Sequence, residues 1–145
     1  MITPVFRQVI YSLAAVLCVL LVSGCAAVTL SPPERAVDDL LQLRAERSTD
    51  ASAYAELLLD PAIAAELAAA AAEEAEDSRP LPEWEEPYIS AESSAGADVV
   101  VVWRNLEEWP EWPAATRFAT QEVDGEWVTV DAEPLQEASI PPPAR

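Results

Sequence analysis

Residues 98–105 read DVVVVWRN and residues 123–130 read VDGEWVTV, and these two stretches decide the fold. The first is a run of β-branched residues that leads into an aromatic one, a composition typical of a strand. The second places Asp124-Gly125 between apolar residues, which is a strong signal for a two-residue hairpin turn. The sequence therefore predicts an antiparallel sheet in this half of the chain. The main predicted strands are 98–105, 114–123 and 126–131.

Side chains alternate between the two faces of a strand. This alternation places Val99, Val101 and Trp103 on one face of the sheet and the intervening residues, up to Arg104, on the other. A weaker strand is predicted over Tyr88–Glu92, before the turn that precedes residue 98. The proline-rich segments 78–87 and 106–113 are predicted to be loops.

Helix signals precede the sheet. Ser31-Pro32 and Asp60-Pro61 are typical of helix starts, and Asp50 caps a short segment between them. The predicted helices run from about 34 to 47, 51 to 59 and 61 to 77. Helices followed by an antiparallel meander predict one α+β domain, with helices packed on a curved sheet of three to four or more strands. We expect this domain to span residues 34–133 and a disordered proline-rich tail to follow over 134–145.

The first 24 residues differ from the rest of the chain. Arg7 and the amino terminus precede an uncharged apolar run of roughly 14 residues, too short for a membrane-spanning helix. Small residues end the run. This pattern predicts a secretory signal peptide over residues 1–24.

The end of that run, Val22-Ser23-Gly24-Cys25, resembles the lipobox of bacterial lipoproteins at all four positions. The resemblance implies cleavage between Gly24 and Cys25 and a diacylglycerol thioether on the Cys25 sulfur. Residues 25–33 would then form a lipidated, palmitate-type anchor and tether to the membrane. The expected address is extracytoplasmic, anchored by lipid to the cell membrane or, in a cell that has one, to the outer membrane. Because Ala26 is not Asp, retention in the inner membrane of a two-membrane cell is not expected.

Charge and residue types restrict the function. The chain has 26 acidic and 8 basic residues, a formal net charge of −18, which disfavours nucleic acid as a partner. It has no histidine, the commonest general base and metal ligand. Cys18 would be removed with the signal peptide and Cys25 would carry the lipid, so no thiol would remain for catalysis or metal binding. We predict no enzyme activity, cofactor or metal site; the acidic runs 83–86 and 107–111 are interpreted as solvated surface in preference to a weak calcium site.

Tryptophan is the remaining candidate for recognition. Trp103 and Trp127 lie in predicted strands and are expected in the sheet core, whereas other aromatic residues flank the prolines of the loops. Arg104 and Arg117 lie within strands, where each could reach an anionic ligand or pair with a neighbouring acid. The candidate contact residues for a ligand or a partner are Trp84, Tyr88, Trp109, Trp112, Arg104 and Arg117.

The order of elements and the hairpin 123–130, of the form acid-Gly-x-Trp-hydrophobic-x-hydrophobic, resemble the NTF2-like, or cystatin-like, cone superfamily. The resemblance implies a sheet curled around the helices. It does not extend to the Asp–His chemistry of catalytic members, because this chain lacks histidine.

The function expected from the sequence is a lipid-anchored, extracytoplasmic binding or scaffolding module that recognises an unknown envelope protein or small ligand. Its recognition surface would involve the loops Trp84–Tyr88 and Leu106–Pro113. Two alternatives remain open. One is a carrier or sensor with an apolar cavity inside the cone, and the other is a hydrolase that uses two carboxylates across a cleft.

Overall fold

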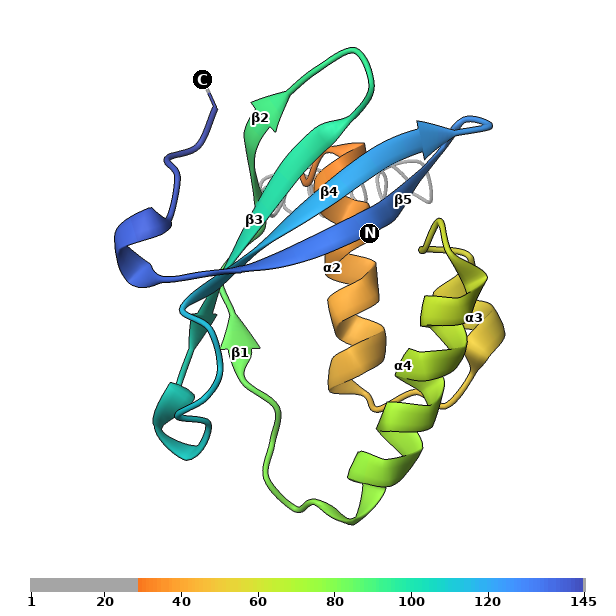
Figure 1. The fold of residues 1–145 in the computed structure, drawn as a ribbon, viewed down its shortest axis with the longest axis vertical. Coiled ribbons are helices and arrows are strands. Elements are labelled where there is room, and N and C mark those ends of the chain that lie inside the picture. The colour runs from red at the N-terminus through yellow and green to blue at the C-terminus, as the bar shows by residue number, and fades with distance from the viewer. Residues whose placement is uncertain (1–28, 145) are drawn as a thin grey trace, which may run out of the picture.

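The computed structural model describes residues 29–144, in which three α-helices precede a five-stranded antiparallel sheet (Figure 1). The α+β fold class predicted from the sequence is therefore confirmed. The α-helices are α2 (Pro32–Ala45), α3 (Ala51–Ala55) and α4 (Pro61–Glu73), and the strands are β1 (Glu83–Trp84), β2 (Tyr88–Glu92), β3 (Ala97–Arg104), β4 (Ala115–Val123) and β5 (Glu126–Leu135). Three short 3₁₀ turns, η1 (Glu74–Glu76), η2 (Leu106–Glu108) and η3 (Glu137–Ser139), complete the described elements.

The helices begin where the caps predict. Glu34 accepts a hydrogen bond from the Ser31 backbone N–H at 2.9 Å, and the Asp60 side chain accepts one from Ala62 N–H at 2.9 Å. The last predicted helix ends early, because α4 stops at Glu73 and continues only as the 3₁₀ turn η1. Acidic side chains at this end oppose the helix dipole, a cause of early termination.

Strand β3 is central to the sheet. It pairs with β4 along one edge, while β2 and β1 pair with successive parts of its other edge, and β5 follows β4. The hairpin between β4 and β5 turns at Asp124 and Gly125, which have φ angles of 52° and 83°. Both residues take the left-handed conformation that a two-residue hairpin turn requires, as predicted.

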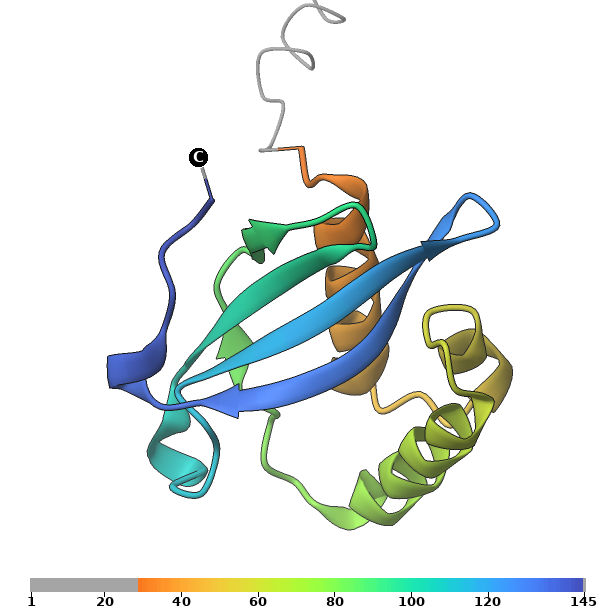
Figure 2. The ribbon, with the colours of Figure 1, turned by 45° about the horizontal axis from the view of Figure 1, so that its top comes forward.

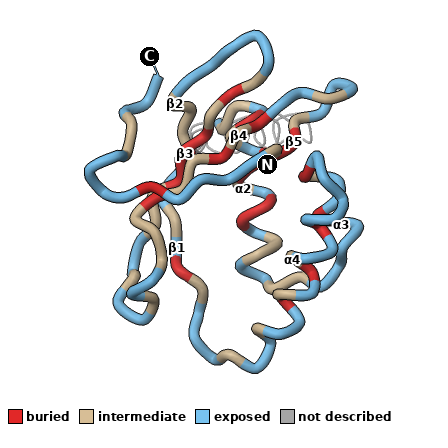
Figure 3. The backbone as a smooth tube through the Cα atoms, viewed as in Figure 1, coloured by how far each residue is buried: buried red, intermediate tan, exposed pale blue. Residues whose placement is uncertain are grey.

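Both faces of the sheet are covered, which explains the unbroken valine run in β3. Val99 and Val101 are fully buried against the helices, together with Val37 and Leu41 of α2 (Figure 3). Val100, on the opposite face, is equally buried in a second cluster with Ala115 and Leu135. Figure 2 shows α2 behind the sheet and α3 and α4 to one side. Both core clusters consist almost entirely of residues of the helices and the sheet, all within residues 29–144.

The C-terminal segment forms the cover of the second face, so the prediction of a disordered tail from residue 134 is wrong. Strand β5 extends to Leu135, the Tyr88 hydroxyl donates to the Pro141 carbonyl at 2.6 Å, and Ala144 N–H donates to the Ile89 carbonyl at 2.7 Å. Ile140 packs on the same cluster. The physical reason is that an apolar sheet face needs a cover, and this segment supplies it. The domain therefore continues past residue 133.

Two further predictions from the sequence concern the loop 78–87 and the signal peptide. The predicted loop 78–87 contains the short strand β1, because Trp84 pairs with Trp103 at the end of β3. The predicted signal peptide, Gly24 and Cys25 lie outside the described residues. Among residues 29–144, no helix is both long and apolar enough to cross a bilayer.

Candidate functional site

A pocket of about 380 Å³ opens between α2, α4, the middle of β5 and the tryptophan-bearing end of the sheet. Its volume falls within the range of small-molecule sites. Most of the wall is apolar. The apolar wall residues are Leu40, Leu41, Ala45, Leu58, Ile63, Leu67, Leu81, Pro82, Trp84, Trp103, Trp112, Phe118, Val130 and Ala132, and the polar ones are Arg44, Thr116, Thr129 and Asp131.

Helix α4 forms one wall of the pocket and is held to the rest of the protein near its two ends. Before the helix, Leu59 N–H donates to the Thr129 carbonyl at 3.0 Å, and Thr129 N–H donates to the Leu57 carbonyl at 2.8 Å. Just after the helix, Glu74 pairs with Arg44 of α2 at 3.1 Å. Between these ends, Ile63 and Leu67 are the residues of the helix that line the pocket.

Four tryptophans form a continuous cluster at the opposite wall. Ring centroids lie 6.2 Å apart for Trp84 and Trp103, 5.4 Å for Trp103 and Trp112, and 5.5 Å for Trp109 and Trp112. All three pairs meet edge to face, the arrangement that the ring quadrupoles favour. Strands β1 and β3 and the β3–β4 loop each contribute, so the cluster ties the predicted loops to the sheet.

Three of the four indole N–H groups have partners within the protein. Trp84 donates to the Asp38 carboxylate, Trp103 to the Thr116 hydroxyl and Trp109 to the Pro80 carbonyl, each at 2.9 Å. The Trp112 Nε1 is buried and has no hydrogen-bond partner in the described part of the chain.

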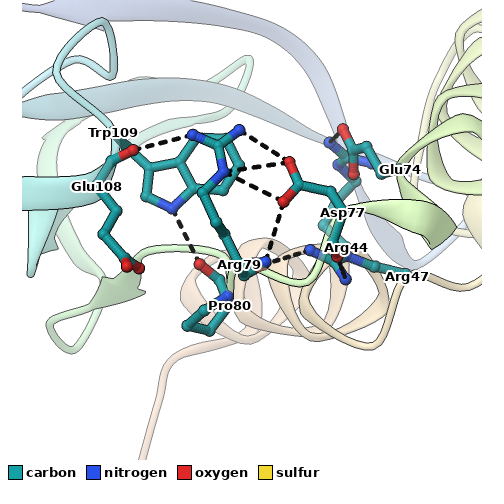
Figure 4. A network of polar contacts seen from close by, with 8 residues as sticks. All are labelled: Arg44, Arg47, Glu74, Asp77, Arg79, Pro80, Glu108 and Trp109. Atoms are coloured by element: carbon teal, nitrogen blue, oxygen red, sulfur yellow. Dashed lines mark hydrogen bonds and ion pairs between the residues drawn. The ribbon is translucent and has the colours of Figure 1, made fainter.

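An arginine-centred network, drawn in Figure 4, fixes the segment that follows α4. The Arg79 guanidinium lies 3.9 Å from the centre of the Trp109 ring, pairs with Asp77 at 2.8 Å and donates to the Glu108 carbonyl at 3.0 Å. Arg47, in the turn after α2, donates to the Asp77 carbonyl at 2.6 Å. Hydrogen bonds from Arg79 lower the pKa of Asp77 to about 2. We call these five residues the loop clamp. The loop clamp fixes the segment after α4 that contains the pocket-wall residues Leu81 and Pro82.

The predicted contact residues divide between the pocket and other surfaces. Trp84 and Trp112 line the pocket, and Trp109 extends their cluster. Tyr88 lies on the opposite face of the sheet, where it packs on the second core cluster. The tertiary structure thus brings the loop tryptophans together and leaves Tyr88 apart.

Arg104 and Arg117, the two arginines within strands, pair with neighbouring acids, which the sequence had left open beside contact with an anionic ligand. Arg104 is exposed and pairs with Glu85 at 3.2 Å. Arg117 pairs with Glu133, its register partner on β5. Neither lies on the pocket wall.

The expectation for Trp103 and Trp127 holds only for the first. Trp103 packs against the helix-side core and also faces the pocket. Trp127 is half-buried near the hairpin tip, outside both core clusters, where it borders a shallow depression with Leu30 and Arg35. The hairpin end projects past the helices, so its first residues have little to pack against.

Within residues 29–144, the acidic residues form neither a cluster placed to hold a metal nor a pair of carboxylates on the pocket wall. Within residues 29–144, no group of three or more acidic, histidine or cysteine side chains is placed to hold a metal. Asp131 is the one carboxylate on the pocket wall as described. The pKa of Asp39 is raised by partial burial and by the adjacent Asp38, but Asp39 lies away from this pocket. The paired carboxylates that a hydrolase needs do not line the pocket.

Sequence reasoning offered an apolar cavity only as an alternative, and it missed Arg44 and the place of the pocket. Arg44 follows Leu40 and Leu41 by four and three residues, a spacing that puts all three on one face of α2. A charged residue on an otherwise apolar helical face was therefore a readable signal. The width of the space beside α4 had no such signal, because it depends on how the helix sits against β5.

Comparisons with protein-family models, with curated proteins and with solved structures find no match to this chain.

Proposed function

We propose that this chain is a lipid-anchored, extracytoplasmic, non-catalytic binding protein that carries a small apolar ligand. The observation that carries the proposal is the apolar pocket of about 380 Å³ walled by α2, α4, β5 and the tryptophan cluster. The carrier alternative drawn from the sequence requires an apolar cavity, and Trp103 of β3 lines this one.

The pocket-wall residues of α2 lie toward the C-terminal end of the helix, whereas the proposed anchor precedes its N-terminal end in the sequence. Cys25 precedes the first turn of the helix by a tether of six residues, Ala26–Ser31. The wall residues on α2 fall within residues 40–45, which at 1.5 Å per residue places them roughly 12 to 20 Å along the helix from Pro32. The pocket of an anchored molecule would therefore stand away from the lipid attachment.

A scaffolding role receives less support from the same residues. It would need the tryptophans of the loops 84–88 and 106–113 on a free surface. Trp84, Trp109 and Trp112 instead contact one another or Trp103 and are half-buried. The resemblance to the NTF2-like cone agrees with helices beside a curved sheet and stays a prediction.

Ligand binding is tested by titrating N-phenyl-1-naphthylamine, a neutral dye whose fluorescence rises in apolar surroundings, into the chain from Ala26 onward. This form contains every described element and lacks the proposed lipid, which would itself bind the dye. We expect saturable binding with one site per chain.

A matched pair of substitutions locates the site. Leu67→Glu puts a carboxylate on the pocket wall and is expected to abolish dye binding. Leu59→Glu makes the same change at a side chain that is 47 % exposed and outside the pocket wall, and is expected to leave binding intact. Binding that does not saturate, or that both variants weaken equally, would contradict the proposal.

The proposed address is tested separately by intact mass and membrane fractionation of the wild type and Cys25→Ser. We expect the wild type to be membrane-bound and to carry diacylglycerol, and the variant to lose that modification. If both forms appear as the same soluble, unlipidated species, the lipoprotein proposal is wrong, whatever the pocket binds.

A further inference from the structure

Apolar side chains are partly exposed at the end of the molecule where the described chain begins. Trp127, just past the turn of the β4–β5 hairpin, is half-buried and lies outside both core clusters. It borders a shallow depression that Leu30 and Leu57 also line, beside Thr29, the first described residue. An indole has a large apolar ring and one polar N–H, and such side chains gather where water meets an apolar phase, as at a bilayer surface.

The length of the connecting chain places this depression close to the proposed anchor. Cys25 and Thr29 are four residues apart, and an extended chain covers at most about 3.6 Å per residue, so their separation cannot exceed roughly 14 Å. A bilayer that holds the chain through Cys25 therefore lies within reach of the depression.

The other four tryptophans lie at the far end of the sheet. They form the cluster at the pocket wall, next to the start of β4 at Ala115. Strand β4 runs from there to Val123 at the hairpin, a length of roughly 26 Å at about 3.3 Å per residue. Figure 2 shows the start of α2 and the tip of the β4–β5 hairpin at one end of the molecule and the β3–β4 loop at the other. Trp127 is thus the tryptophan on the anchor side.

Charge at this end restricts the kind of lipid surface. Asp39, Glu56 and Glu126 line the depression, and Arg35 is the basic residue of its wall. Anionic lipid would repel these carboxylates within a Debye length, about 8 Å at physiological ionic strength. A zwitterionic surface has no net charge and so does not repel them.

From these observations we propose that the end of the molecule formed by Leu30, Leu57 and Trp127 rests on the zwitterionic surface of the bilayer that holds Cys25, with the Trp127 indole among the lipid headgroups. This inference rests on the proposed lipid anchor and adds the orientation of the domain. It leaves the tryptophan cluster, and the pocket wall that the cluster forms, on the side far from the bilayer.

The test attaches the chain from Cys25 onward to vesicles and asks which tryptophan meets the lipid. Cys25 is the one cysteine of this form, so its thiol can be coupled to a maleimide-bearing lipid. The vesicles are phosphatidylcholine, part of it brominated on the acyl chains, because bromine quenches indole fluorescence only at close range. Relative to vesicles without bromine, we expect a loss of about one fifth of the fluorescence, the share of one tryptophan in five.

Substitutions assign the quenched residue. Trp127→Phe should abolish the quenching, and it should fold because Trp127 lies outside both core clusters. Trp109→Phe is the matched control, since it removes a half-buried tryptophan from the far end and should leave the quenching in place. If Trp109→Phe does not fold, Trp84→Phe replaces it as the control.

Three results would overturn the inference. One is a wild type that the brominated vesicles do not quench, and another is a Trp127→Phe variant quenched as strongly as the wild type. The third is a chain from Ala26 onward that forms a dimer in sedimentation and becomes a monomer on Trp127→Phe, because a second copy would then cover the depression. Exchange of the unbrominated lipid for phosphatidylglycerol should weaken the quenching; unchanged or stronger quenching would overturn the zwitterionic surface.

The orientation and the anchor can fail separately, because the coupling supplies the attachment. If intact mass shows lipid on Cys25 of the wild type but the vesicles do not quench Trp127, the orientation is overturned and the anchor stands. If the wild type carries no lipid, the anchor fails and this inference fails with it. Dye binding in the pocket bears on neither.

Discussion

The hydroxyl of Tyr54 joins the end of α2 to the start of α3, and its removal by Tyr54→Phe is the sharpest test of the helical core. Tyr54 is fully buried, and its hydroxyl donates to the Ser48 carbonyl at 2.9 Å, with the Leu43 carbonyl 3.2 Å away. Leu43 retains a second donor, the Ser48 backbone N–H at 3.0 Å, whereas the Ser48 carbonyl would lose its partner.

The magnitude follows from this accounting. One lost hydrogen bond and one acceptor left without a donor should lower the free energy of unfolding by about 1 to 2 kcal/mol. The ring remains, so no large cavity adds to the loss. With a urea m-value of about 1 to 3 kcal/mol per molar, the unfolding midpoint should fall by roughly 0.3 to 2 M.

The assay is equilibrium urea unfolding of the chain from Ala26 onward, followed by circular dichroism. Tyr88→Phe is the matched control. Its hydroxyl bonds the Pro141 carbonyl at 2.6 Å in the C-terminal segment, where water can replace it, so its loss should cost less than about 1 kcal/mol. A Tyr54→Phe protein as stable as the wild type, or less affected than Tyr88→Phe, would refute the reasoning.

Three further outcomes are expected. Gly96→Ala should lower the free energy of unfolding, measured in urea, more than Gly125→Ala does. A Cβ at Gly96 would lie 2.0 Å from a backbone carbonyl oxygen of β4, whereas a Cβ at Gly125 meets open space and costs only the strain of φ +83°, about 1 to 2 kcal/mol. Equal losses in the two variants would contradict this. Lowering the pH should open the loop clamp between about pH 4 and 2, because the pKa of Asp77 is lowered from 3.8 to about 2. The stability contributed by its ionised carboxylate is complete above about pH 4 and is lost as the pH falls through about 2. The readout is tryptophan fluorescence, and Asp77→Asn should abolish this step; a step that persists in the variant belongs to another group. Trp84→Phe should lower the free energy of unfolding by about 1 kcal/mol through loss of the hydrogen bond to Asp38, and Asp38→Asn, which retains an acceptor, should cost less.

Local patterns predicted much of the secondary structure correctly. The valine run of β3, the caps before α2 and α4 and the turn at Asp124-Gly125 are each decided by residues within a few positions of one another. Alternation along β3 also predicted which valines share a face, because the period of a strand is fixed by its backbone.

Features that join distant segments could not be predicted in this way. Strand β1 exists because Trp84 meets Trp103, and the C-terminal segment is ordered because it covers an apolar sheet face that no local pattern assigns to it. The candidate loop tryptophans were identified from their composition, but their edge-to-face cluster depends on the path of two loops.

The sequence alone determined the α+β class, most element boundaries and the absence of histidine. The lipobox at Cys25 rests on resemblance and stays a prediction. The tertiary structure decided where the pocket lies and which buried polar atoms, such as Arg44 Nη1 and Trp112 Nε1, have no hydrogen-bond partner within residues 29–144. The physical reason is that a strand or a cap depends on backbone geometry over a few residues. A cavity instead depends on how completely the side chains of several packed elements fill the space between them, and that is settled only when the elements meet.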